Sequence, residues 1–507
     1  MKILPKLSGS MMLACLATVA AWAGAPEPLV SSFGPIGIQN GMPAPTSIST
    51  LYDERDYQQA VQSYLWALPA VSFAQWQHEQ ANRLGAKNGD LIVYRTFSDK
   101  KGILTANATT PYVIAFVDLS QTGPMVIEMP AGHTAGAIGD VWQREMASLG
   151  ETGSTGDKGG RYLVMPPGYP VPEDADGYTA VISDSVNILL GFRVLDPDPV
   201  QAEKLIGSFG IYPYALRNNP PPTRVMTPEN VPWYGGPPSG LAYWQRLHAL
   251  IQTEPVQERD RFFYAMLAEN GIEKGKPFRP DSRRKAILER AARMGEHMAQ
   301  AAAFAKRTKT SVVWPGSTWR RVTDMADPSQ RVTHYDQLNE RAAWFYEAVT
   351  YAKSMSSTSP GVGQAYLGAY TDRAGNWLDG GRDYTLVIPA HPPAVNFWSL
   401  TVYDAITRAY IDSPVRVPDK SSRMPLLENA DGSVTLYFGP EAPPGKERNW
   451  IQTIPGKNWF AYFRLYGPME NYFNHSWKLG DIEVVSSASR ASYPASVAPS
   501  DEGVRYQ

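Results

Sequence analysis

The chain has 507 residues, a net charge of −2 and only 19% charged residues. No stripe of Lys and Arg stands out, so nucleic acid is excluded as an expected partner. The length suffices for two or three domains, each with its own core, and the frequent Gly and Pro with 11% aromatic residues are typical of a loop-rich β protein.

The first 23 residues are predicted to be a secretory signal peptide. Lys2 and Lys6 give a positive start, residues 11–22 are apolar, and Ala21-Trp22-Ala23 fits a cleavage site. The apolar stretch is too short to span a bilayer, which takes roughly 20 apolar residues. We therefore expect a periplasmic or secreted protein without a stable membrane anchor, whose mature chain begins at Gly24.

The only cysteine, Cys15, lies inside this predicted signal peptide. Cleavage would remove it, so the mature chain is expected to have no disulfide, no cysteine nucleophile and no thiolate metal site. A lipid on Cys15 is the alternative. It is less favoured because the apolar run continues past the cysteine.

Residues 24–50 are rich in Gly, Pro and Ser and predict a flexible N-terminal arm. A helix followed by a β module is expected over residues 51–200. In this helix Ala60, Tyr64, Ala67 and Val71 recur at spacings of three and four, with Pro69 as a kink. The sequence then predicts strands at residues 112–117, 125–129 and 161–165.

Residues 201–358 are predicted to form a Pro-rich crossing, at residues 218–239, and a helical region. Long helices are expected over residues 241–270 and 282–306, the second capped by Asp281 or Ser282. Between residues 335 and 355, apolar side chains recur at spacings of four and three, which predicts another buried helical face. Its members are Leu338, Ala342, Phe345, Val349 and Ala352.

Residues 359–485 return to a β pattern. Strands are expected at residues 384–388, 397–403, 434–438 and 459–466, and residues 429–432 predict a turn. Short strands at this spacing favour a sandwich or a jelly roll, and residues 486–507 have the composition of a tail. The whole chain is therefore expected to be α+β and mainly β.

Several short motifs occur in order along both β modules. In the first module they are Asn107–Tyr112, Asp118-Leu119, Gly123-Pro124, Asp140–Gln143 and Gly159–Leu163 with Pro166–Tyr169. In the second they are Asp372–Gly380, Phe397–Asp404, Asn449-Trp450 and Arg464–Pro468. The first set resembles domain of unknown function 1254 and the second resembles domain of unknown function 1214, which together form an exported bacterial family.

This resemblance covers residues 50 to 485. It implies an immunoglobulin-like N-terminal sandwich, a helical middle and a C-terminal jelly-roll-like sandwich, but it implies little about activity. One position departs from the family. Relatives often carry Asp where this chain has Thr109, so a chemical role of that aspartate would be missing here.

Metal and serine chemistry have weak support. None of the seven histidines pairs at i, i+4, so no metal site and no cofactor are expected, although histidines brought together by the fold remain an alternative. There is no G-x-S-x-G motif. The S-x-x-K match at Ser98–Lys101 is more typical of a solvated loop.

Carboxylates beside aromatic residues are the remaining candidates for catalysis. Asp140 and Asp404 are predicted proton donor or acceptor groups, because apolar rings raise the pKa of a neighbouring carboxyl group. Arg408 is predicted to hold an anionic group. The alternative is structural, since Asp in Gly-rich turns usually binds backbone N–H groups and Asp404 and Arg408 could form an ion pair.

Substrate contacts are predicted for six further residues near these carboxylates or at strand ends: Trp142, Tyr112, Trp398, Tyr403, Asp372 and His391. With Trp377, Trp450 and Trp477, the aromatic members could form a stacking surface for a flat or sugar-like ligand. Burial in the core is the alternative for each tryptophan. His391 follows a strand and Pro-Ala, as His133 does, which could simply be a shared way of ending a strand.

Three functions are compatible with these features. The favoured one is an exported, metal-independent hydrolase or lyase that acts on a small organic molecule in a cleft shared by the two β modules, with Asp140, Trp142, Tyr403, Asp404 and Arg408 converging there. The alternatives are a non-catalytic binding protein for a small or carbohydrate-like ligand, and a β scaffold that self-assembles into a homo-oligomer.

Overall fold

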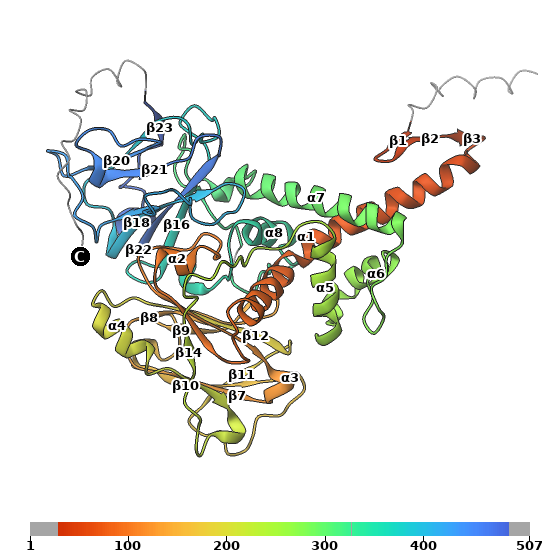
Figure 1. Cartoon of the computed structure of the whole chain (residues 1–507), viewed down its shortest axis with the longest axis horizontal. Helices are drawn as coiled ribbons and strands as arrows, with labels where there is room; N and C mark the ends of the chain where they lie inside the picture. The colour runs from red at the N-terminus through yellow and green to blue at the C-terminus, as the bar shows by residue number, and fades with distance from the viewer. Residues whose placement is uncertain (1–28, 326, 486–507) are drawn as a thin grey trace, which may run out of the picture. The chain divides into compact units, whose positions relative to one another are not determined.

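The computed structural model describes residues 29–325 and 327–485 and shows a mixed α+β protein (Figure 1). The predicted signal peptide and the tail from Ser486 lie outside these residues. The chain divides into two compact units, one ending at Gln58 and one starting at Gln59. No helix of the described residues is long and apolar enough to cross a membrane.

The first unit contains two short hairpins where the sequence predicts an arm. Strand β1 (Leu29–Ser31) pairs with β2 (Gly34–Ile36), and β3 (Ile38–Gln39) pairs with β4 (Met42–Pro43). The unit ends within helix α1 (Ile48–Asn82), which contains Pro69 as predicted.

In the second unit, the N-terminal β module consists of two sheets. The six-stranded sheet has the order β14 (Val225–Met226), β5 (Leu91–Tyr94), β6 (Tyr112–Asp118), β12 (Asn187–Val194), β8 (Thr134–Asp140), β9 (Glu145–Gly150). The four-stranded sheet has the order β11 (Thr179–Ile182), β10 (Gly160–Met165), β7 (Met125–Met129), β13 (Gly210–Pro213). The strands predicted at residues 112–117, 125–129 and 161–165 are thus confirmed as β6, β7 and β10.

Side chains alternate between the two faces of this six-stranded sheet, as strand geometry requires. Val113, Ala115 and Val117 of β6 enter the apolar core of the module. Phe116 points to the other face and packs edge-on against Phe73 of α1, with 4.9 Å between ring centroids. Helix α1 therefore covers the face that is turned away from the module core.

Two helices of the helical region differ from the sequence prediction. The helix expected over residues 241–270 is split into α5 (Leu241–Thr253) and α6 (Arg261–Glu269). Pro255 explains the break, because the residue before a proline is driven out of the helical region. Glu254 accordingly has an extended backbone (φ −73°, ψ 142°).

The second difference is the end of α8 (Leu338–Glu347), which stops before the predicted Val349 and Ala352. Ala348 is extended (φ −141°, ψ 173°) and Thr350 has a positive φ of 56°, so the helical period does not continue. Helix α7 (Ser282–Phe304) begins as expected, with the Asp281 side chain accepting from the backbone N–H of Arg284. The shorter helices are α2 (Phe97–Lys100), α3 (Leu119–Thr122), α4 (Pro199–Ile206) and α9 (Glu470–Phe473).

The C-terminal β module also consists of two sheets, coloured from blue-green to blue in Figure 1. The five-stranded sheet has the order β15 (Arg320–Arg321), β16 (Gln364–Ala369), β22 (Trp459–Pro468), β18 (Ala394–Asp404), β19 (Asp419–Ser421). The four-stranded sheet has the order β21 (Trp450–Gln452), β20 (Val434–Gly439), β17 (Tyr384–Ile388), β23 (Glu483–Val484). All four strands predicted here are confirmed.

The two faces of the five-stranded sheet differ in chemistry. Along β22, Ala461, Phe463 and Leu465 point into the apolar core between the sheets. Tyr462 and Arg464 alternate with them and therefore point to the opposite face, yet they are also buried. That opposite face packs against the N-terminal β module, and the candidate site lies there.

Candidate functional site

The face of the five-stranded sheet that is turned away from its core carries mostly polar side chains, and we call it the polar face. Strand register places the following buried residues on it: Gln364 and Tyr366 of β16, Ser399, Thr401 and Tyr403 of β18, Asp419 and Ser421 of β19, and Tyr462, Arg464 and Tyr466 of β22. Buried polar groups in proteins are normally hydrogen-bonded, so the polar groups of this buried face require hydrogen-bond partners.

The N-terminal β module supplies several of these partners through the loop after α2. Arg464 Nη2 donates a hydrogen bond to the carbonyl oxygen of Thr105 at 2.6 Å, and the Tyr403 hydroxyl donates to that of Ala106 at 2.5 Å. Arg464 Nη1 donates to the Tyr403 hydroxyl at 2.8 Å. Arg193 of β12 donates to Gln364 Oε1. These contacts join the two modules.

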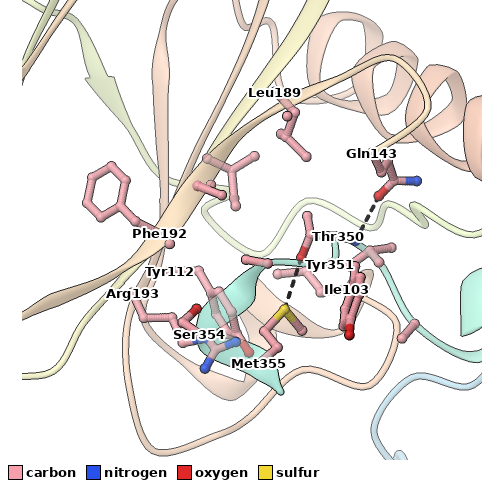
Figure 2. A pocket seen from close by; sticks show the side chains of 18 of the residues that line it. Ile103, Tyr112, Gln143, Leu189, Phe192, Arg193, Thr350, Tyr351, Ser354 and Met355 are labelled. Carbon is pink, nitrogen blue, oxygen red and sulfur yellow. Dashed lines mark hydrogen bonds between the residues drawn. The ribbon is translucent and has the colours of Figure 1, made fainter. Parts of the chain in front are cut away.

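A cavity of about 60 Å³ lies beside these contacts, and we call it the inter-module cavity. Its apolar lining includes Ile103, Leu189, Phe192, Val349 and Met355. Its polar lining includes Tyr112, Gln143, Arg193, Thr350, Tyr366 and Arg464. Figure 2 shows part of this lining, with the Gln143 side chain accepting a hydrogen bond from the backbone N–H of Thr350 at 2.7 Å.

Two cationic side chains of the lining are almost fully buried. Arg193 is 6% exposed and Arg464 is 2% exposed. Among the described residues neither takes part in an ion pair; both lie over tyrosine rings instead. The guanidinium carbon of Arg193 is 5.6 Å from the Tyr112 centroid, and that of Arg464 is 4.8 Å from the Tyr366 centroid. Arginine stays protonated in proteins, so both charges are present at neutral pH.

Carboxylates in this region are few. Asp419 is buried, and burial raises its pKa to about 6 although Lys100, Lys420 and Arg464 act to lower it. Burial lowers the pKa of Lys100 to about 8, against the effect of Asp419. Burial also raises the pKa of Glu151, although the positive charge of Arg193 acts to lower it. The lining of the inter-module cavity itself contains the two buried cations Arg193 and Arg464 and one carboxylate, that of the half-buried Glu145.

Several buried atoms of the polar face have no hydrogen-bond partner among the described residues. They include Arg464 Nε, Gln364 Nε2 and the Tyr466 hydroxyl. Buried polar atoms in proteins are normally hydrogen-bonded to protein, water or ligand. Of these three residues Arg464 lines the inter-module cavity, and its unused donor favours a polar molecule as the occupant.

The predicted catalytic residue Asp140 ends β8 and closes a tight turn. One carboxylate oxygen accepts from the backbone N–H groups of Trp142 at 2.8 Å and Arg144 at 2.9 Å. Burial raises the pKa of Asp140, although Arg144 and these hydrogen bonds act to lower it. Asp140 and Trp142 line a second cavity of about 10 Å³, together with Glu254 and Asp260.

Asp404 and Arg408 lie in the turn that follows β18. Asp404 accepts from the backbone N–H groups of Ile406 and Thr407 and from Lys457 Nζ at 2.9 Å. Burial acts to raise the pKa of Asp404, but these contacts outweigh it and lower the pKa below its usual value. Arg408 has a positive φ of 57° and donates to the carbonyl oxygens of Tyr346 and Ile406.

These contacts therefore show no cleft that Asp140 and Asp404 share. Of five cavities in the described part of the chain, none is lined by both Asp140 and Asp404. Catalysis by either carboxylate stays a prediction.

The six predicted substrate contacts have separate locations. Tyr112 lines the inter-module cavity, and Tyr403 binds Arg464 beside it. Trp142 packs against Trp66, with 4.7 Å between ring centroids. The remaining three are Trp398, which belongs to the apolar core, Asp372, which accepts from the backbone N–H groups of Ala374 and Asn376, and His391, which is exposed.

Arg193 and Arg464 supply the positive charge of the site, and neither was predicted from the sequence to be a site residue. The signal for Arg464 was available, because residues 459–466 alternate between a fully apolar set and a set with Tyr462, Arg464 and Tyr466. Arg193 carries no such signal. No group of three or more His, Cys, Asp or Glu able to hold a metal ion occurs in residues 29–325 and 327–485.

Comparison with known families identifies both β modules. The family described as a protein of unknown function, DUF1254, matches residues 89–213, and the family described in the same way, DUF1214, matches residues 363–470. This confirms the predicted resemblance to the two families and their order along the chain. No functionally curated protein matches the chain.

Two solved structures resemble this protein. The VPA0106 protein from Vibrio parahaemolyticus is 16% identical, with a TM-score of 0.54, over 85% of this chain and 100% of its own. An uncharacterized protein from Burkholderia cenocepacia is 12% identical, with a TM-score of 0.40, over 88% of this chain and 98% of its own. The first likeness shows a shared fold and nothing about activity.

Proposed function

We propose that this chain, which combines a DUF1254 module with a DUF1214 module, binds a small organic molecule in the inter-module cavity. The observation that carries the proposal is the lining of that cavity, in which apolar walls meet a few buried polar groups. Ligand sites have this composition, and they are frequent at interfaces between domains.

Several residues that line the cavity lie on β-strands, which supports this function. Leu189, Phe192 and Arg193 belong to β12, and Tyr366 and Arg464 belong to adjacent strands of the other module. Groups held by strands keep a fixed geometry, so a ligand finds its contacts preorganised. The alternative of an inert polar interface does not account for unpaired donors such as Arg464 Nε.

Filling the cavity tests this function. Ala137 of β8 lines the cavity and is only half-buried, so Ala137→Leu is expected to fold and to occupy ligand space. We expect this variant to lose at least about tenfold in affinity for any ligand found by thermal-shift screening, as expected when ~1.4 kcal/mol of binding free energy is lost.

The matched control is Ala147→Leu in the neighbouring strand β9, since Ala147 is half-buried but lies outside the cavity lining. Affinities measured by calorimetry should be the same for this control and the unmodified protein. Equal affinity of the Ala137→Leu variant would show that the ligand binds elsewhere.

A second candidate function is hydrolysis or elimination by carboxylate acid–base chemistry, as a metal-independent hydrolase or lyase. The observation that favours it is the raised pKa of the buried Asp140 beside a small cavity. A carboxyl group with a raised pKa can serve as a general acid.

Two variants of Asp140 separate catalysis from a structural role. Asp140→Asn keeps an oxygen that can accept from Trp142 and Arg144, so we expect it to melt close to the unmodified protein but to lose turnover. Asp140→Ala loses that oxygen and is expected to lose about 1–2 kcal/mol of unfolding free energy. Turnover that survives in the Asn variant would exclude the catalytic role.

We propose in addition that the two modules are an immunoglobulin-like and a jelly-roll-like sandwich, and that the chain is exported to the periplasm or the medium. The pairing of two sheets around one apolar core in each module supports the first point. The lysine-containing start and apolar stretch of residues 1–23 support the second. Self-assembly as a β scaffold is the function to consider if no ligand binds.

A further inference from the structure

We propose that the ligand of the inter-module cavity is a short-chain monocarboxylate whose carboxylate binds Arg193 and Arg464. This inference rests on the proposed function, since it names the chemical class of the molecule that the cavity takes.

The first argument is the charge of the lining. Burying a charge without a partner is costly, and buried cations in proteins are normally paired. Lys306, for example, lies 4.0 Å from Glu347. Arg193 and Arg464 have no such ion pair among the described residues. The carboxylate of Glu145 also lines the cavity, but it accepts from the Lys353 backbone N–H at 2.5 Å and from the Ser148 hydroxyl.

Two other buried arginines also lack an ion pair within residues 29–325 and 327–485, but they do not line the cavity. Arg341 donates to the carbonyl oxygen of Trp66 at 2.6 Å and lies over the Trp142 ring. Arg408 donates to two carbonyl oxygens. Among the described residues, Arg193 and Arg464 are the cations on the wall of this cavity, and neither takes part in an ion pair.

The second argument is the set of donors that remain. A guanidinium group has five N–H donors, and among the described residues Arg193 uses one of them, on Gln364. Arg464 uses both Nη atoms on protein oxygens, and its Nε has no partner. The planar arginine fork matches the two oxygens of a carboxylate, so Arg193 can bind a carboxylate through two donors.

The third argument is size and polarity. A volume of about 60 Å³ holds about four to six non-hydrogen atoms, since one water takes roughly 10–15 Å³ in this measure. The walls away from the arginines are apolar, with Leu189, Phe192 and Val349. A second charged group would have to be buried against them. The lining therefore favours acetate, propionate or butyrate over a dicarboxylate or inorganic phosphate.

The experiment measures binding of propionate and butyrate by calorimetry and thermal shift, with propionamide, butyramide, succinate and inorganic phosphate for comparison. We expect saturable binding of the monocarboxylates and binding of the amides that is at least about tenfold weaker, because charge-assisted hydrogen bonds are the stronger kind. Succinate and phosphate are expected to bind more weakly than butyrate.

Arg193→Met is expected to abolish carboxylate binding and to raise the melting temperature of the ligand-free protein, because it removes an unpaired buried charge. If this variant does not fold, Arg193→Lys tests carboxylate binding instead. Lysine keeps the positive charge but lacks the planar pair of donors of the guanidinium group, so about tenfold weaker binding is expected. The control is Arg423→Met, because Arg423 lies over the Phe397 ring outside the cavity lining and its replacement should leave the affinity unchanged.

The two proposals fail in different ways. Amides that bind as tightly as carboxylates, and lose affinity in Ala137→Leu, would overturn the anion inference and keep the proposed function. Preference for phosphate or succinate would overturn the ligand class. Absence of binding by every compound would remove the support for both proposals.

Discussion

Replacing Arg464 by Ala is expected to lower the free energy of unfolding by about 3–5 kcal/mol, which is large for a single substitution. Arg464 donates to the Tyr403 hydroxyl at 2.8 Å and to the Thr105 carbonyl oxygen at 2.6 Å, and thereby joins the two modules. Hydrogen bonds from a charged group contribute about 1.5–3 kcal/mol each. Its loss also leaves a cavity beneath the Tyr366 ring.

Tyr403→Phe is the matched variant, because it keeps the ring and removes only the hydroxyl group. The Ala106 carbonyl oxygen then loses a 2.5 Å hydrogen bond, for which we expect about 1–3 kcal/mol. Chemical denaturation of both single variants and the double variant measures the coupling between them. Because Arg464 and Tyr403 bind each other, their effects should not add; additive effects, or a loss below 1 kcal/mol for Arg464→Ala, would contradict a joining role.

Arg193 and Arg464 are therefore expected to respond with opposite signs. Arg464 has several hydrogen bonds to protein atoms, and the net effect of its removal is destabilising. Arg193 has one, to Gln364, so relief of an unpaired charge dominates when it is replaced by an apolar side chain. This contrast separates Arg464, which joins the two modules in addition to lining the cavity, from Arg193, whose charge serves mainly the ligand.

Local sequence signals predicted much of the fold. Short apolar runs bounded by turn residues placed β6, β7, β10, β17, β18, β20 and β22, and a helix cap placed the start of α7. The failures have local causes that the helical period alone does not contain. Pro255 interrupts the helix at Glu254, and the backbone turns away at Ala348 and Thr350, whose neighbours then line the cavity.

The candidate site was less predictable because it is assembled from distant segments. Tyr112 was proposed and lines the cavity, whereas Arg193 is separated from its partner Gln364 by 171 positions in the sequence. Asp140 and Asp404 were predicted to be catalytic because they are carboxylates near aromatic residues in the sequence. In the structure, both accept hydrogen bonds from backbone N–H groups in turns. A turn and a catalytic site use the same residue types, so only the contacts distinguish them.

The stability of the protein is expected to fall as the pH rises from about 4.5 to 7, with a large contribution from Glu347. This side chain is fully buried, the Tyr370 hydroxyl lies 2.9 Å from both of its oxygens, and Lys306 lies 4.0 Å away. Burial raises the pKa of Glu347 from 4.5 to about 7, although Lys306 and Tyr370 act to lower it.

The sign follows from proton linkage. Between pH 4.5 and 7 the folded state keeps the proton on Glu347 and the unfolded state has lost it, so unfolding releases a proton and each pH unit costs about 1.4 kcal/mol of stability. The contribution is fully present below pH 4.5 and is lost as the pH passes 7, about 3 kcal/mol in all. Asp419, whose pKa is raised to about 6, adds a smaller effect of the same sign.

Glu347→Gln isolates this contribution, because the amide has a similar shape and does not titrate. Denaturation measured at half-unit steps from pH 4.5 to 7.5 should show a slope that is less negative, by about 1.4 kcal/mol per unit, than in the unmodified protein. Lys306→Met removes a cation that lowers the pKa of Glu347, so it should extend the pH-dependent range above 7. An unchanged slope in Glu347→Gln would mean that Glu347 is already ionised in the folded state at pH 5, and that Lys306 and Tyr370 outweigh its burial.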